Sequence, residues 1–196
     1  DHDSIREYIC NFIMSKLETN TIDTVSGTTN LTIGSTNTST ITVPNGKLTG
    51  QNYPSFRAYR ASAQNISGAT ETKVPFDTEN FDTDNTYDNS TNYRFTPGVS
   101  GKYFVFNQVC CTATASNALI FATVIMKKSG SEIARNTVDP DDSYRHNQAF
   151  PFFATVVDMN TTDYIEIFIN ADVNSGSPQI GDGSNQTYFG AYRIGS

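Results

Sequence analysis

The sequence is poor in the residues that build disulfide frameworks and membrane spans. Its three cysteines are Cys10, Cys110 and Cys111, and neighbours on a strand point to opposite faces, so they do not form a disulfide framework. We expect buried or half-buried thiols that pack as small hydrophobic residues. No run approaches the roughly 20 apolar residues that cross a bilayer, and the N-terminus lacks the basic and apolar regions of a secretory signal. We therefore expect a soluble mature chain without membrane insertion.

Basic residues are also scarce. The chain has 13 Lys and Arg against 20 Asp and Glu, a net charge of -7 and a pI near 4.7. Proteins that bind nucleic acid neutralise phosphates with clustered Lys and Arg, and an acidic chain repels that backbone. The charge balance excludes nucleic acid as the expected partner.

Motifs of catalysis are missing as well. There is no Gly-x-Ser-x-Gly elbow, no phosphate loop and no His-Glu-x-x-His, and the two histidines, His2 and His146, form no credible pair with a cysteine. Two distant carboxylates would leave no local motif, so a glycosidase-type pair is not tested by this search. We expect no enzyme and no cofactor. The oxygen-rich segments 138–146 and 181–185 lack the spacing of an EF-hand, so we expect no metal ligands and keep calcium as an alternative.

What the sequence contains in quantity is Asn, Ser, Thr and Gly, with 37% hydrophobic and 12% aromatic residues. This composition favours strands and turns over helices, so the expected fold is all-β. Residues 1–17 are the exception, because apolar residues recur there at helical spacing. The stripe formed by Ile5, Ile9, Phe12 and Ile13 is the expected particle anchor. A bundle with copies of itself is the alternative, and Met14 leaves open an upstream extension over residues 1–13.

Residues 18–52 form a polar tract with isolated apolar points. Leu31 and Ile33 alternate with polar residues, as do Ile41 and Val43, and Gly, Asn and Ser separate the two pairs. This pattern predicts short strands with tight turns. Because the tract has too few apolar residues to form its own core, we expect it to pack against other chains. It resembles the shafts and attachment arms of bacteriophage fibres, in which three chains intertwine. A disordered linker is the alternative.

Residues 53–196 are expected to form a jelly-roll head, because short strands alternate with turn signals. The predicted strands are Ser55–Ala61, Lys73–Phe76, Asn92–Thr96, Gly101–Cys111, Ala118–Lys127, Ser131–Asn136, Ala149–Val157, Tyr164–Asn170 and Thr187–Ile194. The strand near 164–170 has Ile165, Ile167 and Ile169 on one face and polar residues on the other. The strand near 149–157 is apolar on both faces, so a single sandwich covers only one of them. We expect another subunit to cover the second face.

The segments "TNYRFTPGVSGKYFVF", from Thr91, and "TYFGAYRIG", from Thr187, carry a family resemblance. An aromatic strand entered through a Pro-Gly corner, with a closing strand containing Phe-Gly-x-Tyr, resembles the globular head of complement C1q and its tumour-necrosis-factor-like relatives. The resemblance spans about residues 53–196. The sequence departs from the family pattern at two places. Asn92 stands where the family usually has Gly, and Thr162-Asp163 stands where it usually has Gly-Asp.

This resemblance implies a C1q/TNF-like jelly-roll sandwich that forms a homotrimer, with the inner sheet around the threefold axis. The expected interface residues are Tyr103, Phe153, Tyr188 and Tyr192. Gly101 and Gly190 are expected to be structural, for a tight corner and a close approach of chains.

The expected function is that of a virion surface protein, either a fibre or a capsid-bound decoration. Its N-terminus would attach to capsid or tail proteins, and Arg145, His146 and Asp182 in the head loops would bind a host-surface glycan or protein. The sequence does not separate capsid from tail attachment. The alternative is a secreted recognition protein, against which stand the missing signal peptide, the missing collagenous stalk and the unpaired cysteines.

Overall fold

The computed structural model describes residues 54–140 and 145–195, and these residues form strands connected by turns, with no helix. It follows that no helix among them is long and apolar enough to cross a membrane. The strands are β1 (Ser55–Tyr59), β2 (Gln64–Asn65), β3 (Thr72–Lys73), β4 (Thr78–Asp82), β5 (Tyr87–Asp88), β6 (Arg94–Phe95), β7 (Gly101–Gln108), β8 (Cys111–Ala113), β9 (Leu119–Lys128), β10 (Ser131–Val138), β11 (Gln148–Ala149), β12 (Phe152–Met159), β13 (Ile165–Val173), β14 (Pro178–Ile180) and β15 (Tyr188–Gly195).

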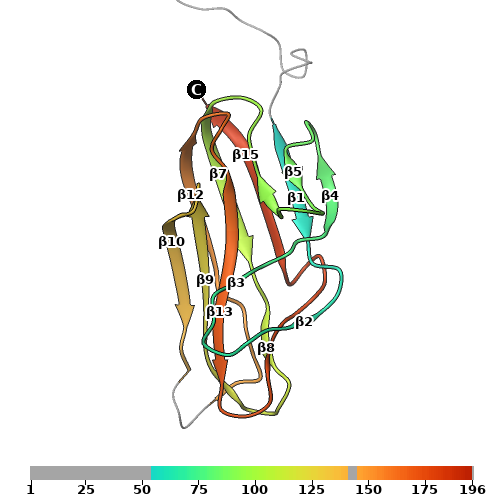
Figure 1. The fold of residues 1–196 in the computed structure, drawn as a ribbon, viewed down its shortest axis with the longest axis vertical. Helices are drawn as coiled ribbons and strands as arrows, with labels where there is room; N and C mark the ends of the chain where they lie inside the picture. The colour runs from blue at the N-terminus through green and yellow to red at the C-terminus, as the bar shows by residue number, and fades with distance from the viewer. Residues whose placement is uncertain (1–53, 141–144, 196) are drawn as a thin grey trace, which may run out of the picture. The chain divides into compact units, whose positions relative to one another are not determined.

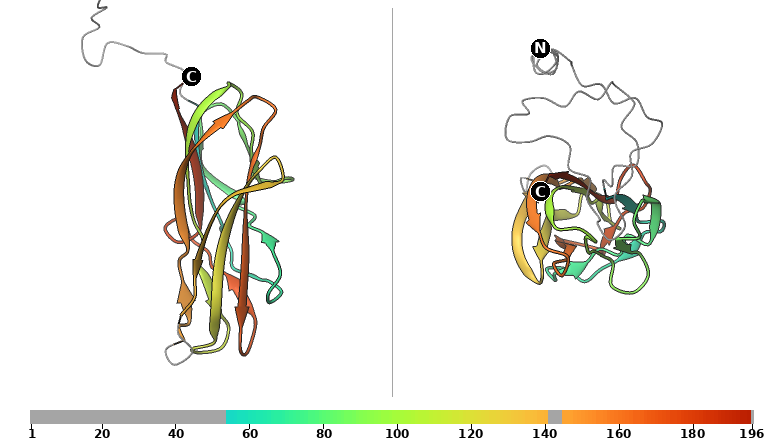
Figure 2. Two further views of the ribbon diagram at one scale, coloured as in Figure 1. Left: turned by 90° about the vertical axis from the view of Figure 1, so that its left-hand side faces the viewer. Right: turned by 90° about the horizontal axis from the view of Figure 1, so that it is seen from above.

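Two antiparallel sheets stack to form a sandwich (Figures 1 and 2). The first sheet has the order β12-β7-β15-β1-β4, and we call it the front sheet. The second, the back sheet, has the order β10-β9-β13-β6-β5, with β3 also paired to β13. This arrangement is an antiparallel sandwich of strands, so the expected all-β class is confirmed.

A small third sheet, with the order β11-β8-β14-β2, continues the front sheet where its strands bend. One bend lies between β7 and β8, because the backbone N–H of Cys110 donates to Thr187 Oγ1 at 3.1 Å instead of extending the ladder. The other lies between β11 and β12 at Pro151, which has no N–H to donate. The predicted strands 101–111 and 149–157 are therefore each two strands.

Aromatic rings fill the space between the two sheets. Phe189 on β15 is fully buried, and its ring centroid lies 4.9 Å from that of Phe56 and 5.6 Å from that of Phe76. Phe56 also stacks on Tyr87 and Phe95 of the back sheet, at 4.8 and 4.9 Å. Rings that bridge the two layers fix how the sheets lie on each other.

The alternation predicted for β13 is confirmed on its inner side. Ile165, Ile167 and Ile169 are fully buried. The outer side is less exposed to solvent than expected, since Glu166 is only 8% exposed. Its carboxylate accepts a hydrogen bond from the Lys73 ammonium of β3 at 2.5 Å. The short strand β3 supplies the cation that allows this carboxylate to be covered.

Each predicted strand overlaps an observed one, whereas β2, β4, β5 and β14 were not predicted. These four are short and mostly polar, and all except β14 are edge strands. The pairing partners of β2, β4 and β14 come from distant parts of the chain, such as β1 for β4 and β8 for β14, whereas β5 pairs with the next strand, β6. Local periodicity carries no signal for such strands. The predicted helix 1–17 and arm 18–52 lie outside the described residues and stay predictions.

The structural role expected for two glycines agrees with the geometry. A side chain on Gly190 would collide with the ring of Phe106 on the neighbouring strand and would lie 2.9 Å from the carbonyl oxygen of Phe56. Gly101 has a φ of +150° and lies against the carbonyl of Gly195, where a Cβ would clash. Both positions therefore need glycine.

The turn between β5 and β6 is closed by a single carboxylate. Asp88 accepts hydrogen bonds from the backbone N–H groups of Ser90, Thr91 and Asn92 at 3.1, 2.8 and 3.0 Å, and from Asn92 Nδ2 at 2.7 Å. These bonds, led by that from Thr91, hold the pKa of Asp88 well below its usual value. The Asn92 side chain, at a position where the family usually has Gly, is thus part of this turn.

The buried aromatic cluster generates a stability prediction. Phe189→Ala should lower the free energy of unfolding by about 3–5 kcal/mol, because it leaves a cavity among three other rings. Urea unfolding at one fixed protein concentration measures it. The control is Ile133→Ala, since Ile133 is 43% exposed and should cost under about 1 kcal/mol. Equal losses in the two variants would contradict this core.

The Asp88 turn generates a pH prediction. The folded-state pKa of Asp88 is depressed, so its stabilisation is present above the unfolded value of about 4 and is lost as the pH falls below it. Asp88→Asn should therefore destabilise the protein at pH 7, and the gap to the wild type should shrink in acid. Urea unfolding at a series of pH values tests this, and a gap that is constant with pH would refute it.

Candidate interaction surface

The front sheet turns an aromatic face away from the core. On β7, Tyr103 and Val105 point inward and are fully buried, whereas the alternate residues Phe104 and Phe106 point outward. The same alternation on β12 turns Phe152 outward, and it is 60% exposed. This outward face is the candidate interaction surface.

Strand register lines the outward side chains up in rows. Val156 on β12 is opposite Phe104 on β7, and Phe104 is opposite Tyr192 on β15. The Phe104 and Tyr192 ring centroids are 5.3 Å apart. Val156 and Tyr192 are 52% and 43% exposed, so the row is open to solvent in the single chain. Contiguous exposed apolar groups of this kind mark interaction surfaces.

A second row is held in place by a glycine and an arginine. The ring of Phe106 lies over Gly190, which has no side chain to displace it. The Arg57 guanidinium lies 4.6 Å from the ring centre of Tyr188, and its two terminal nitrogens each donate at 2.5 Å, to Asn80 Oδ1 and to the carbonyl of Ser184. The rings of Phe106 and Tyr188 are thus packed against their own sheet and have defined positions before any partner binds.

The structure divides the four predicted interface residues into two pairs. Tyr188 and Tyr192 lie on the outward face, and their place in an interface stays a prediction. Tyr103 was placed on the wrong face, because its ring packs 5.3 Å from Phe95 in the core and its hydroxyl donates to the Val99 carbonyl at 2.7 Å. Phe153 also packs against the core, one residue out of phase with Phe152.

Sequence reasoning missed Phe104, Phe106 and Phe152 as interface candidates. The strands are apolar on both faces, so composition does not tell which set of alternating residues faces inward. One signal in the sequence was usable: Gly190 and Tyr192 share a face, and a glycine flanked by rings indicates a ring lying over it from the next strand.

The predicted host-binding residues do not form one cluster. Arg145 and His146 precede β11, and the His146 carbonyl accepts from the N–H of Leu119 at 3.1 Å. Asp182 follows β14, between two glycines whose N–H groups bond to Cys110 and Arg60. Strand β8 lies between β11 and β14 in the small sheet. The predicted anchor residues Ile5, Ile9, Phe12 and Ile13 lie outside the described residues.

Cys110 and Cys111 are buried free thiols, as expected. Burial raises the pKa of both, to about 12 for Cys111. They therefore stay protonated at neutral pH and pack as small hydrophobic residues. Among residues 54–140 and 145–195, no group of three or more His, Cys, Asp or Glu side chains is arranged to hold a metal ion.

Comparison with known proteins identifies the fold and no closer relationship. No protein-family model and no curated protein matches the sequence. Among solved structures, murine APRIL at pH 8.5 is similar over 73% of this chain and 100% of its own, with a TM-score of 0.53 and 12% identity. The Eiger TNF of S. frugiperda is similar over 74% and 92%, with a TM-score of 0.52 and 9% identity.

The globular domain of the zebrafish complement 1qA protein is similar over 72% of this chain and 97% of that domain, with a TM-score of 0.51 and 12% identity. These three neighbours are a complement domain and two proteins of the tumour-necrosis-factor type. The described residues thus have the C1q/TNF-like jelly-roll fold that the sequence predicted.

Proposed function

We propose that this chain is a homotrimeric virion surface protein, with residues 53–196 as its C1q/TNF-like recognition head. One observation carries the trimer: the front sheet exposes Phe152, Val156 and Tyr192 on a single apolar surface. Burying a side chain of this size is worth about 1.5–3 kcal/mol. A surface repeated in every copy therefore favours association of identical chains.

The family resemblance supports the same face. In C1q/TNF-like heads the inner sheet packs around a threefold axis, and in this chain β7, β12 and β15 belong to the front sheet. The rings on their outer side would meet those of two other copies. Tyr188 and Tyr192 would lie in that contact, joined by Phe104, Phe106 and Phe152.

The virion setting rests on the sequence of residues 1–52. The Thr/Asn/Ser-rich tract resembles the arms of bacteriophage fibres, and the stripe of Ile5, Ile9, Phe12 and Ile13 would attach to a capsid or tail protein. Within the head, β1 begins at the end of the sandwich where β15 finishes, and β10 leads to the opposite end (Figure 1). Arg145 and His146 follow β10, so the proposed host-binding segment would lie at the end of the head opposite the start of β1.

A secreted recognition protein is the second candidate, because the neighbours by fold include a complement domain. Cys110 and Cys111 weigh against it, since both are free thiols and secreted proteins usually oxidise their cysteines in pairs.

The oligomer prediction is that the purified chain has about three times its 21.5 kDa mass in light scattering. Val156→Glu combined with Tyr192→Glu should give a folded monomer, because buried unpaired carboxylates oppose association. The matched control is Ile133→Glu, which adds a carboxylate at an exposed site of the back sheet and should stay trimeric. A monomeric wild type at micromolar concentration would refute the trimer.

The virion prediction separates anchoring from recognition. Ile9→Asp with Phe12→Asp should abolish incorporation into particles and leave a folded trimeric head, whereas Arg145→Glu with Asp182→Lys should leave incorporation intact and reduce adsorption to host cells. Particle composition and adsorption rate measure the two effects. Normal adsorption by particles that lack the protein would exclude the receptor role and leave decoration as the function.

A further inference from the structure

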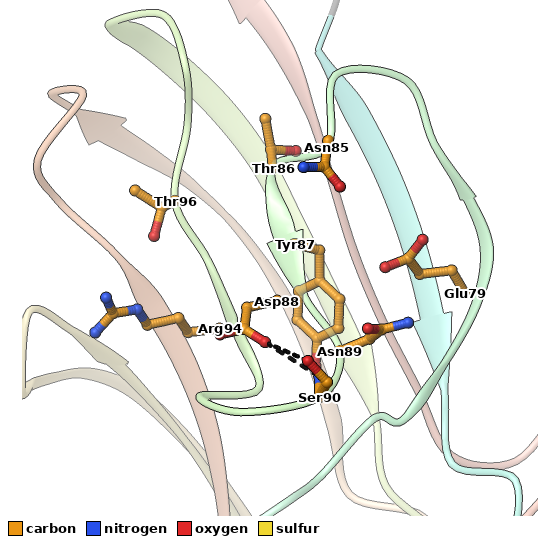
Figure 3. A pocket seen from close by; sticks show the side chains of 9 residues that line it. All are labelled: Glu79, Asn85, Thr86, Tyr87, Asp88, Asn89, Ser90, Arg94 and Thr96. Atoms are coloured by element: carbon orange, nitrogen blue, oxygen red, sulfur yellow. Dashed lines mark hydrogen bonds between the residues drawn. The ribbon is translucent and has the colours of Figure 1, made fainter.

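A pocket of about 480 Å³ opens on the side of the sandwich where the edge strands β4 and β5 face each other (Figure 3). The other side is closed, since Asn136 Nδ2 on β10 donates to the Phe152 carbonyl on β12 at 2.6 Å. The pocket volume lies within the range of about 300–1,000 Å³ that is typical of small-molecule sites. Neither the aromatic surface of the front sheet nor the loops at Arg145 and Asp182 contribute to it.

Polar side chains of both hydrogen-bonding types line this pocket. Glu79 of β4 contributes a carboxylate, Asn85 and Asn89 contribute amides, Ser90 contributes a hydroxyl and Arg94 of β6 contributes a guanidinium. In Figure 3, Glu79 and Arg94 lie on opposite sides of the lining. Burial and the nearby Asp82 raise the pKa of Glu79. The lining thus offers donors and acceptors facing one another across one cavity.

The lining has fixed positions. The Arg94 guanidinium lies 4.6 Å from the centre of the Tyr164 ring, which holds its plane. The Asp88 turn holds Ser90 through hydrogen bonds from its N–H and its hydroxyl, at 3.1 and 3.3 Å. A site whose polar groups are already placed loses less entropy when a ligand binds.

Tyr87 points to a missing partner. It lies centrally among the lining residues in Figure 3, is 3% exposed, and stacks its ring on Phe56, yet its hydroxyl has no hydrogen-bond partner among the described residues. Leaving a buried hydroxyl unpaired costs about 1–3 kcal/mol. The hydroxyl is covered in the free chain, so a ligand reaches it only if the Asn89 side chain, which lies beside the Tyr87 ring in Figure 3, turns aside while the Asp88 turn keeps its position.

The charges of the lining residues and their free oxygen atoms disfavour an anion and a calcium ion as the ligand. The pocket has two carboxylates, Glu79 and Asp88, against the single guanidinium of Arg94, so an anion is disfavoured. The lone pairs of Asp88 are already used by N–H groups of the turn, which leaves too few free carboxylate oxygens for a calcium ion. A neutral ligand that both donates and accepts hydrogen bonds fits best, and neutral sugars have this chemistry.

We propose that this edge pocket binds a neutral sugar unit, with Glu79, Asn89 and Arg94 bonding its hydroxyl groups and the Tyr87 hydroxyl completing the set. The inference does not depend on the trimer or on the virion, because every lining residue comes from one chain. It gives the recognition head a ligand class at a site separate from its association surface.

The test uses the full-length protein and ligand-observed saturation-transfer NMR. Glucose, galactose, mannose, rhamnose, N-acetylglucosamine and N-acetylgalactosamine are each titrated to about 50 mM, since a dissociation constant of 1 mM corresponds to only about −4 kcal/mol. N-acetylneuraminic acid is the anionic comparison. We expect at least one neutral sugar to bind and the acid not to bind.

The variant that decides the site is Tyr87→Phe, which removes only the unpaired hydroxyl. It should weaken sugar binding about tenfold and leave the midpoint of urea unfolding unchanged or higher, because no protein hydrogen bond is lost. Asn89→Ala should also weaken binding. Tyr59→Phe is the matched control, a tyrosine on the outward face of the front sheet, and should bind as the wild type does.

Three results would overturn the proposal. They are no binding by any of the six neutral sugars, unchanged affinity in both Tyr87→Phe and Asn89→Ala, and a lowered unfolding midpoint for Tyr87→Phe, which would show that the hydroxyl has a structural partner. None of these results depends on the oligomer mass. The homotrimer proposal and the sugar-binding proposal are therefore tested independently.

Discussion

The packing of aromatic rings between the two sheets is the interaction on which the rest of this head depends. Phe56 on β1 contacts Phe189 in its own sheet and stacks on Tyr87 and Phe95 of the other. Rings are large and rigid, so this cluster fixes the spacing of the sheets and their relative position. It also decides which side of β7 and β15 faces inward.

That decision creates the aromatic surface of the front sheet. Once Tyr103, Val105 and Phe189 are buried, the alternation of strand side chains turns Phe104, Phe106 and Tyr188 outward. A lone sandwich gains nothing from apolar residues there. Under the proposed trimer, a second copy of the same chain would carry the matching surface.

The same cluster accounts for the edge pocket. Tyr87 ends the row of stacked rings at the open side of the sandwich, where its hydroxyl meets polar residues of β4 and of the β5–β6 turn. Its ring is part of the core, while its hydroxyl remains unpaired. One residue thus connects the stability of the fold with the chemistry of the pocket, which is why removing the hydroxyl alone separates the two.

The sequence by itself determined the all-β class, the strands with strong apolar patterns and the fold family. The isoleucines of β13 alternate so clearly that their burial was predictable, and the segments from Thr91 and Thr187 carried the resemblance. Residue type also predicted buried thiols at Cys110 and Cys111 and structural roles for Gly101 and Gly190. The contacts that make glycine necessary, with the Phe106 ring at Gly190 and with the Gly195 carbonyl at Gly101, come from the tertiary structure.

Tertiary structure decided the rest. Tyr103 and Phe153 were predicted to face outward, but in the structure they pack against the core. The prediction failed because strands that are apolar on both sides have no polar residue to mark the outer face. The edge strands β4 and β5 are short and polar, so they form only where β1 and β6 pair with them. The pocket needs Glu79, Tyr87 and Arg94 from three strands, and only the stacking of two sheets brings those residues together.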